Sequence, residues 1–139
     1  MEIGSIISGT LKPDEIAKAL IDVLEYEDDD AAEAIRAEYN LENPEDAVMA
    51  HETALEILSD FLPPFCYIGT LEGDPAHMGV WVDDQEICDS EESGELVRVK
   101  AGEEWPPLDE VAEYVLEVTD HGNATLYTVY PRKEVWAIV

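Results

Sequence analysis

The spacing of apolar residues along the chain changes at Pro63-Pro64. Before this point, apolar residues recur every three or four positions, which is the period of an amphipathic helix. After it, short apolar runs alternate with turn residues, a pattern typical of β-strands joined by hairpins. The change predicts helices in the first half of the chain and a sheet in the second.

Three helices are predicted before the two prolines. Pro13, followed by two acidic residues, is a typical helix start, because proline fits the first turn and acids favour the positive end of the helix dipole. We expect Asp29 or Asp30 to cap a second helix, which continues to Tyr39. Asn43-Pro44 is the clearest start signal in the chain, and its helix is expected to run to Phe61. The apolar face of the first helix comprises Ile16, Ala19, Leu20, Val23 and Leu24.

The second half predicts several strands and few helices. Asp120-His121-Gly122 is a hairpin signal between two apolar runs, and residues 108–113 are expected to form either a helical turn or a strand. The predicted strands cover residues 65–69, 78–82, 86–88, 95–100, 114–119, 123–129 and 134–139. We therefore expect one α+β domain over residues 1–139, with N-terminal helices packed against a C-terminal antiparallel β-meander.

The composition predicts a strongly acidic surface for this fold. The 139 residues include 34 Asp and Glu against seven Lys and Arg, a formal net charge of −27. A hydrophobic fraction of 46% favours a globular domain over disorder. The charge is −14 in residues 1–62 and −13 in residues 63–139, so it does not form an acidic tail.

The two cysteines, Cys66 and Cys88, are too few for a disulfide framework. We expect them to be buried small hydrophobic residues in a reduced protein, although two thiols on neighbouring strands could oxidise. No apolar run has the length of a membrane span, and the N-terminus lacks the basic region of a signal peptide. These features predict a cytoplasmic protein, and its charge predicts repulsion from anionic membranes and nucleic acids.

No motif indicates catalysis, a metal site or a cofactor. A nucleophile elbow of the GxSxG type is absent, and the acidic runs lack the central glycine and the spacing of an EF-hand loop. The three histidines and two cysteines show neither CxxC nor HExxH spacing. His121 is interpreted as a turn residue, and the three tryptophans as core or core-edge residues. We therefore expect a protein that is not an enzyme and has no cofactor.

The charge by itself does not predict a mimic of DNA. Over the surface of about 7,200 Å² expected for one domain of this mass, 27 charges average roughly one per 270 Å². Duplex DNA carries roughly one per 110 Å², so mimicry requires acids gathered on one face or aligned by a homodimer. Lysine and arginine are both rare, which favours a function of the charge over adaptation to salt.

The densest acidic run is the candidate partner-binding site. It lies between the first two predicted helices, where acids also cap a helix, so a purely structural role is the alternative. Its acidic residues are Glu25, Glu27, Asp28, Asp29, Asp30 and Glu33.

Three stretches of the chain resemble a group of small acidic proteins encoded by bacteriophages and prophages. They are Ser8-Gly9-Thr10-Leu11 with Pro13-Asp14-Glu15, Pro63-Pro64-Phe65-Cys66-Tyr67-Ile68-Gly69 with Gly73-Asp74 and Gly79-Val80-Trp81, and Asp120-His121-Gly122-Asn123-Ala124-Thr125-Leu126-Tyr127 with Glu134-Val135-Trp136. The resemblance implies a mobile-element origin and assigns no functional residue. Small acidic phage proteins include inhibitors that occupy nucleic-acid-binding surfaces of host defence systems, an analogy of charge and setting.

These observations predict a non-catalytic interaction protein that binds a basic surface, expected on a host nucleic-acid-binding protein, as a nucleic-acid mimic or anti-defence inhibitor. A homodimer is compatible with this role. Two alternatives stay open: a salt-adapted acidic domain, which could be an enzyme, and a phage structural or assembly protein.

Overall fold

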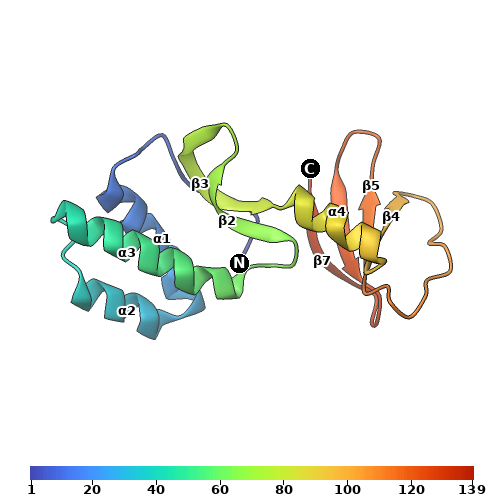
Figure 1. The fold of residues 1–139 in the computed structure, drawn as a ribbon, viewed down its shortest axis with the longest axis horizontal. Helices are drawn as coiled ribbons and strands as arrows, with labels where there is room; N and C mark the ends of the chain where they lie inside the picture. Colours follow the sequence, from blue (N-terminus) through green and yellow to red (C-terminus); the bar gives the residue numbers. More distant parts are fainter. The chain divides into compact units, whose positions relative to one another are not determined.

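The computed structural model describes all residues, 1–139, and its contacts group them into two compact units. The first unit comprises Met1–Leu62 and Cys66–Val82, and the second comprises Pro63–Phe65 and Asp83–Val139. Helices dominate the first part of the chain and strands the last, so the predicted α+β class is confirmed (Figure 1). Residues 1–139, expected to form a single domain, thus contain two compact units, each with its own sheet. None of the helices is long and apolar enough to span a membrane.

Three helices form one layer of the first unit: α1 (Pro13–Glu27), α2 (Asp29–Glu38) and α3 (Pro44–Leu58), which a short 3-10 helix (Ser59–Phe61) extends. All three lie where the apolar spacing predicts them. The Asn43 side chain caps α3 by accepting hydrogen bonds from the backbone of Glu45 and Asp46. The cap of α2 is Asp28, which accepts from Ala31, and not Asp29 or Asp30 as expected.

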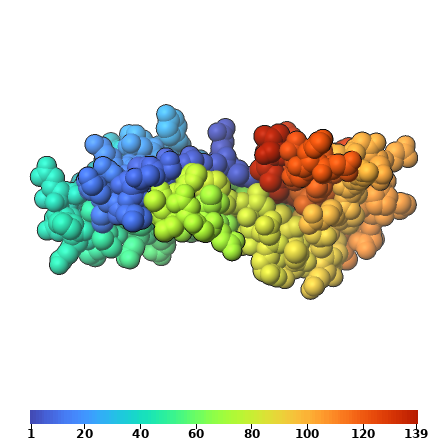
Figure 2. Space-filling view, turned by 90° about the horizontal axis from the view of Figure 1, so that it is seen from above, coloured from blue at the N-terminus to red at the C-terminus, as the bar shows by residue number.

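The first sheet has the strand order β1-β3-β2, with both pairs antiparallel: β1 (Gly4–Ser8), β2 (Cys66–Leu71) and β3 (Asp74–Val82). The N-terminal segment therefore lies beside residues about 70 positions later, as the blue and lime-green atoms show in Figure 2. The core between helices and sheet includes Leu20, Ile21, Leu24, Leu58 and Met78. Burial of this apolar surface holds the helices on the sheet.

The second unit consists of α4 (Asp84–Ser93) and a sheet of four strands in the order β4-β5-β6-β7. The strands are β4 (Leu96–Lys100), β5 (Tyr114–Val118), β6 (Ala124–Thr128) and β7 (Lys133–Ile138). Residues 120–122 form the turn of the β5–β6 hairpin, as predicted. Trp136 of β7 binds the segment Pro63–Phe65 to this sheet, because its indole N–H donates to the carbonyl of Pro64 at 2.9 Å.

Residues 108–113 contain a turn and no strand, with the N–H of Ala112 donating to the carbonyl of Asp109 at 3.4 Å. Three details of the sequence-based prediction are wrong. Residues 86–88 belong to α4 and not to a strand, because Asp83 caps a helix there and Gly94 ends it in the left-handed conformation. The strands make two sheets instead of one meander, and β4 pairs with β5 in parallel. The strand β1 was not predicted.

Candidate interaction surfaces

Negative charge covers both units of the protein. The net charge is −16 for the first unit and −11 for the second. Five of the 34 acidic residues lie within 4.0 Å of a cationic nitrogen and a sixth, Asp74, lies 3.8 Å from a ring nitrogen of His77, whereas the other 28 form no ion pair. Most carboxylates are therefore available to a cationic partner.

Three of the six predicted binding residues make contacts within the first unit, two of them at the junction of α1 and α2. Glu25 accepts a hydrogen bond from Arg36 of α2 at 3.2 Å, and Glu27 lies 3.2 Å from the amino group of Met1. Asp28 caps α2 through the backbone N–H of Ala31 at 3.1 Å. The structural role considered as an alternative thus accounts for half of the predicted site.

The other three predicted residues, Asp29, Asp30 and Glu33, are exposed and form no ion pair. Positions three and four apart share one side of a helix, so the three carboxylates form a single stripe on α2. The buried residues of this helix, Ala32 and Ile35, lie on its other side. We call Asp29, Asp30 and Glu33 the α2 acidic stripe.

Tyr26 is an exposed aromatic residue within the predicted acidic run. Its exposed fraction is 92%, the largest of any tyrosine in the chain. It borders a groove of about 570 Å³ that is lined by Met1–Ile6, Val23, Glu27 and Val80. The sequence signal was present, because the helical period places Tyr26 off the apolar face of α1.

The helix α4 is a second acidic surface, and sequence reasoning missed it. Five of its ten residues are acidic and none is basic. Only Glu91 forms an ion pair, with the guanidinium of Arg98 on β4 at 2.6 Å, and Asp89 accepts a hydrogen bond from the side-chain amide of Gln85 at 3.0 Å. Burial and repulsion from Asp83 and Glu95 raise the pKa of Glu86. The acidic residues of α4 are Asp84, Glu86, Asp89, Glu91 and Glu92.

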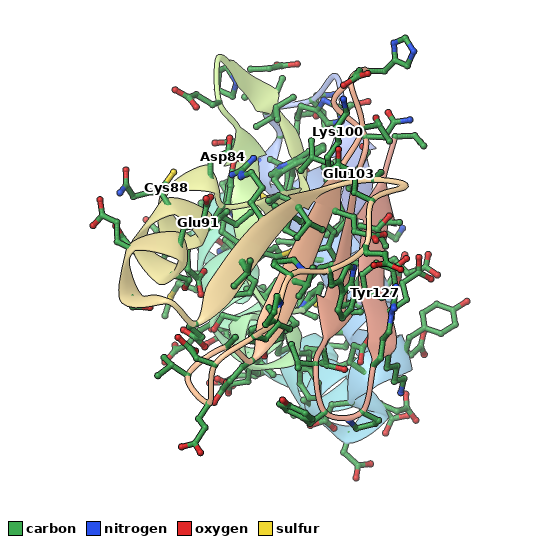
Figure 3. The ribbon with its side chains drawn as sticks, turned by 90° about the vertical axis from the view of Figure 1, so that its right-hand side faces the viewer. Asp84, Cys88, Glu91, Lys100, Glu103 and Tyr127 are labelled. Carbon is green, nitrogen blue, oxygen red and sulfur yellow. The ribbon has the colours of Figure 1, made fainter.

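The remaining candidates for chemistry are dispersed. No three histidine, cysteine or acidic side chains are arranged as a set of metal ligands. Cys66 is buried in β2 as expected, but the expectation of burial is wrong for Cys88, which is exposed on the helix α4 (Figure 3). The two thiols therefore do not lie on neighbouring strands. His121 lies in the β5–β6 turn, and Trp136 is buried while Trp81 and Trp105 are half-buried, in agreement with the sequence.

Comparison of the chain with protein-family models, with curated proteins and with solved structures gives no match. What the protein binds must therefore follow from the chemistry of its own surface. Unpaired carboxylates attract cationic groups over a distance set by the salt concentration. An exposed tyrosine supplies apolar contact area with a polar tip. These two properties occur together at the Tyr26 groove with the α2 acidic stripe, where the exposed fraction of the tyrosine is largest, and also at a smaller groove that Tyr130 lines with Glu110 and Glu113.

Proposed function

We propose that this protein is a non-catalytic interaction protein that binds a basic protein surface through Tyr26 and the α2 acidic stripe. The observation that carries the proposal is the tyrosine ring with an exposed fraction of 92% within an acidic run and beside a groove. An exposed ring removes little apolar area from water and so contributes little to the stability of the free protein. At interfaces, by contrast, tyrosine is one of the residue types that contribute most to affinity.

The two kinds of residue have different roles in this proposal. The carboxylates speed association with a basic partner, and this effect weakens as salt is added. The tyrosine lengthens the lifetime of the complex by filling an apolar pocket on the partner. Loss of the carboxylates should therefore change the association rate, and loss of the ring should change the dissociation rate.

We further propose that the partner is a host nucleic-acid-binding protein and that the chain is encoded by a phage or prophage. The second acidic surface supports the idea of mimicry. Four acids without an ion pair over the ten residues of α4 correspond to about one charge per 4 Å of helix axis. A single strand of DNA has a similar spacing, about 3.4 Å per phosphate. The charge density averaged over the whole surface, about one net charge per 320 Å², is lower than that of duplex DNA, roughly one per 110 Å². Mimicry would therefore depend on local surfaces such as α4.

Capture from a bacterial lysate by the immobilised protein tests the proposal. Tyr26→Ser and Glu33→Lys are the informative variants, since neither residue has a structural partner. Tyr130→Ser and Glu56→Lys are matched controls, because Tyr130 is also an exposed tyrosine and Glu56 is an exposed acid on α3. We expect basic proteins that the wild-type chain retains in 0.1 M KCl, that duplex DNA releases, and that both informative variants fail to retain.

The controls should retain these proteins as the wild type does. If the two informative variants bind as well as their controls, the Tyr26 surface is not the binding site. If the wild-type chain retains no basic protein at low salt, the interaction role itself is refuted. Association kinetics with a retained protein then separate the two contributions, with a lower association rate for Glu33→Lys and a higher dissociation rate for Tyr26→Ser.

A further inference from the structure

In the second unit, two aromatic rings meet on the sheet face that α4 does not cover. Tyr127 of β6 lies on this face, and Asp84, Cys88 and Glu91 of α4 lie on the other side of the sheet (Figure 3). Trp105, in the connection between β4 and β5, makes an edge contact with Tyr127 at 5.5 Å between ring centroids. Its indole N–H donates to Glu117 of β5 at 3.0 Å, which fixes the orientation of the ring.

A guanidinium group covers these rings. Arg132, in the turn between β6 and β7, lies 3.8 Å from the centroid of Trp105 and 5.6 Å from that of Tyr127. The other two arginines of the chain are bound by carboxylates instead: Arg36 by Asp22 and Glu25, and Arg98 by Glu91. Arg132 forms no ion pair and is exposed, although the protein has 34 acidic residues. The aromatic pair therefore accommodates a cation without help from a carboxylate contact.

The surroundings of the rings also favour a cation. Desolvation and the charge of Glu117 raise the pKa of Tyr127, with a further contribution from Glu134, whereas Arg132 lowers it. The ring faces present negative electrostatic potential, and the two carboxylates add to it. A positive group at this place thus interacts favourably with both the rings and the acids.

We propose that Trp105 and Tyr127 form a binding site for an arginine side chain of a basic protein, and that Arg132 occupies this site in the free protein. The seated guanidinium of Arg132 identifies the chemistry of the ligand, because a planar group stacks on an indole ring better than a compact ammonium does. The site lies in the second unit and uses no residue of the Tyr26 surface. It therefore holds or fails independently of the function proposed above.

Arg132 can leave the site at a small cost. A cation–π contact at an exposed position is weak, and no ion pair or hydrogen bond of the Arg132 side chain reinforces it. The turn that carries Arg132 is held separately, by the hydroxyl of Thr128, which donates to the carbonyl of Pro131 at 2.7 Å. The side chain of Arg132 can thus swing out while the turn stays in place, and an arginine from a partner can take its position.

An internal competitor gives a clear prediction for Arg132→Ala. The strength of an exposed cation–π contact implies that its removal raises the affinity for an external arginine about three- to sixfold. Lys133→Ala is the matched control, because it removes the same charge from the next residue, which makes no cation–π contact or ion pair. An acetylated tetra-arginine amide serves as the probe, and the tetra-lysine peptide has the same charge without the guanidinium groups.

Calorimetric titration of both variants with both peptides tests the proposal, together with the indole N–H resonance of Trp105 in ¹⁵N spectra. We expect a larger affinity gain for Arg132→Ala than for Lys133→Ala with tetra-arginine and a smaller difference with tetra-lysine. Tetra-arginine should shift the Trp105 resonance, and Trp105→Leu in the Arg132→Ala background should abolish the extra gain. Equal gains for the two variants with tetra-arginine, or a Trp105 resonance that does not move, would overturn the proposal.

Discussion

Gly79 is the position at which a single methyl group should do most damage to the first unit. It is buried in the central strand β3, where it pairs with Ser5 of β1 and with Gly69 of β2. A Cβ atom at this position would lie 2.5 Å from the carbonyl oxygen of Gly4 and 2.6 Å from the ring of Trp81. Both distances are about 1 Å shorter than a normal contact. Gly79→Ala therefore forces β1 or Trp81 to move.

Neither neighbour can give way freely. The atom of Gly4 that the new Cβ would meet belongs to the backbone of β1 and cannot rotate away. The indole of Trp81 is held by a hydrogen bond of 3.1 Å to the carbonyl of Gly69. Overpacking of this kind lowers the free energy of unfolding by about 1–3 kcal/mol. The smaller conformational freedom of alanine in the unfolded chain offsets about 0.4–1 kcal/mol of this loss. We expect a net loss of about 1–2 kcal/mol, or roughly 5–15 °C in the melting temperature of a unit of this size. Because β1 lines the groove beside Tyr26, the same change should also weaken partner binding.

Gly69→Ala is the matched control, since its Cβ would meet only the ring of Tyr67 at the ordinary distance of 3.8 Å. Two units can unfold separately, so a single melting temperature does not describe the chain. Amide hydrogen exchange followed by mass spectrometry resolves them. We expect faster exchange of peptides from β1 and β3 in Gly79→Ala and no change in β5 and β6. Equal protection in the two glycine variants would refute the close approach of β1 and β3.

Two further predictions concern salt and pH. If the charge serves binding, the protein should already unfold cooperatively in 0.1 M KCl. It should gain stability in 2 M KCl, because screening reduces the repulsion among its carboxylates. A cooperative unfolding transition that occurs only in 2 M KCl would support the salt-adapted alternative. Burial lowers the pKa of His51 on α3, whose Nε2 has no hydrogen-bond partner. Below its ordinary pKa of about 6.5, the unfolded chain binds the proton more readily than the folded one, so stability falls as the pH falls. Chemical unfolding at pH 7.5 and pH 5 should show a smaller loss for His51→Gln than for the wild type, and an equal loss would contradict the burial of a neutral imidazole.

Local rules were sufficient for the helices of the first unit. Asn43-Pro44 starts α3 because the carboxamide accepts from backbone N–H groups and proline needs no donor there. The helix α4 escaped detection because it buries only Ile87 and Ser90 and has no apolar stripe to produce a period. Its capping residues were visible in the sequence, with Asp83 three positions before Glu86 and Gly94 at the end.

The candidate sites could likewise be predicted only in part from the sequence. The acidic run of residues 25–33 was identified from composition, but the sequence does not indicate which carboxylates have partners. Arg36 reaches back 11 residues to Glu25, and the amino group of Met1 lies against Glu27. These contacts leave Asp29, Asp30 and Glu33 as the exposed acids of the run that have no partner. The cluster of Trp105, Tyr127 and Arg132 joins a loop, a strand and a turn, and no spacing rule connects them.

The sequence by itself determined the α+β class, three of the four helices, the β5–β6 hairpin and the acidity of the surface, because each depends on neighbouring residues or on composition. The tertiary structure decided the division into two units, the pairing of β1 with β3 and the parallel pairing of β4 with β5. The physical reason is that strand pairing depends on which distant segments together bury apolar surface and satisfy their backbone hydrogen bonds. The same long-range packing selects which of many similar carboxylates and rings stay exposed to a partner.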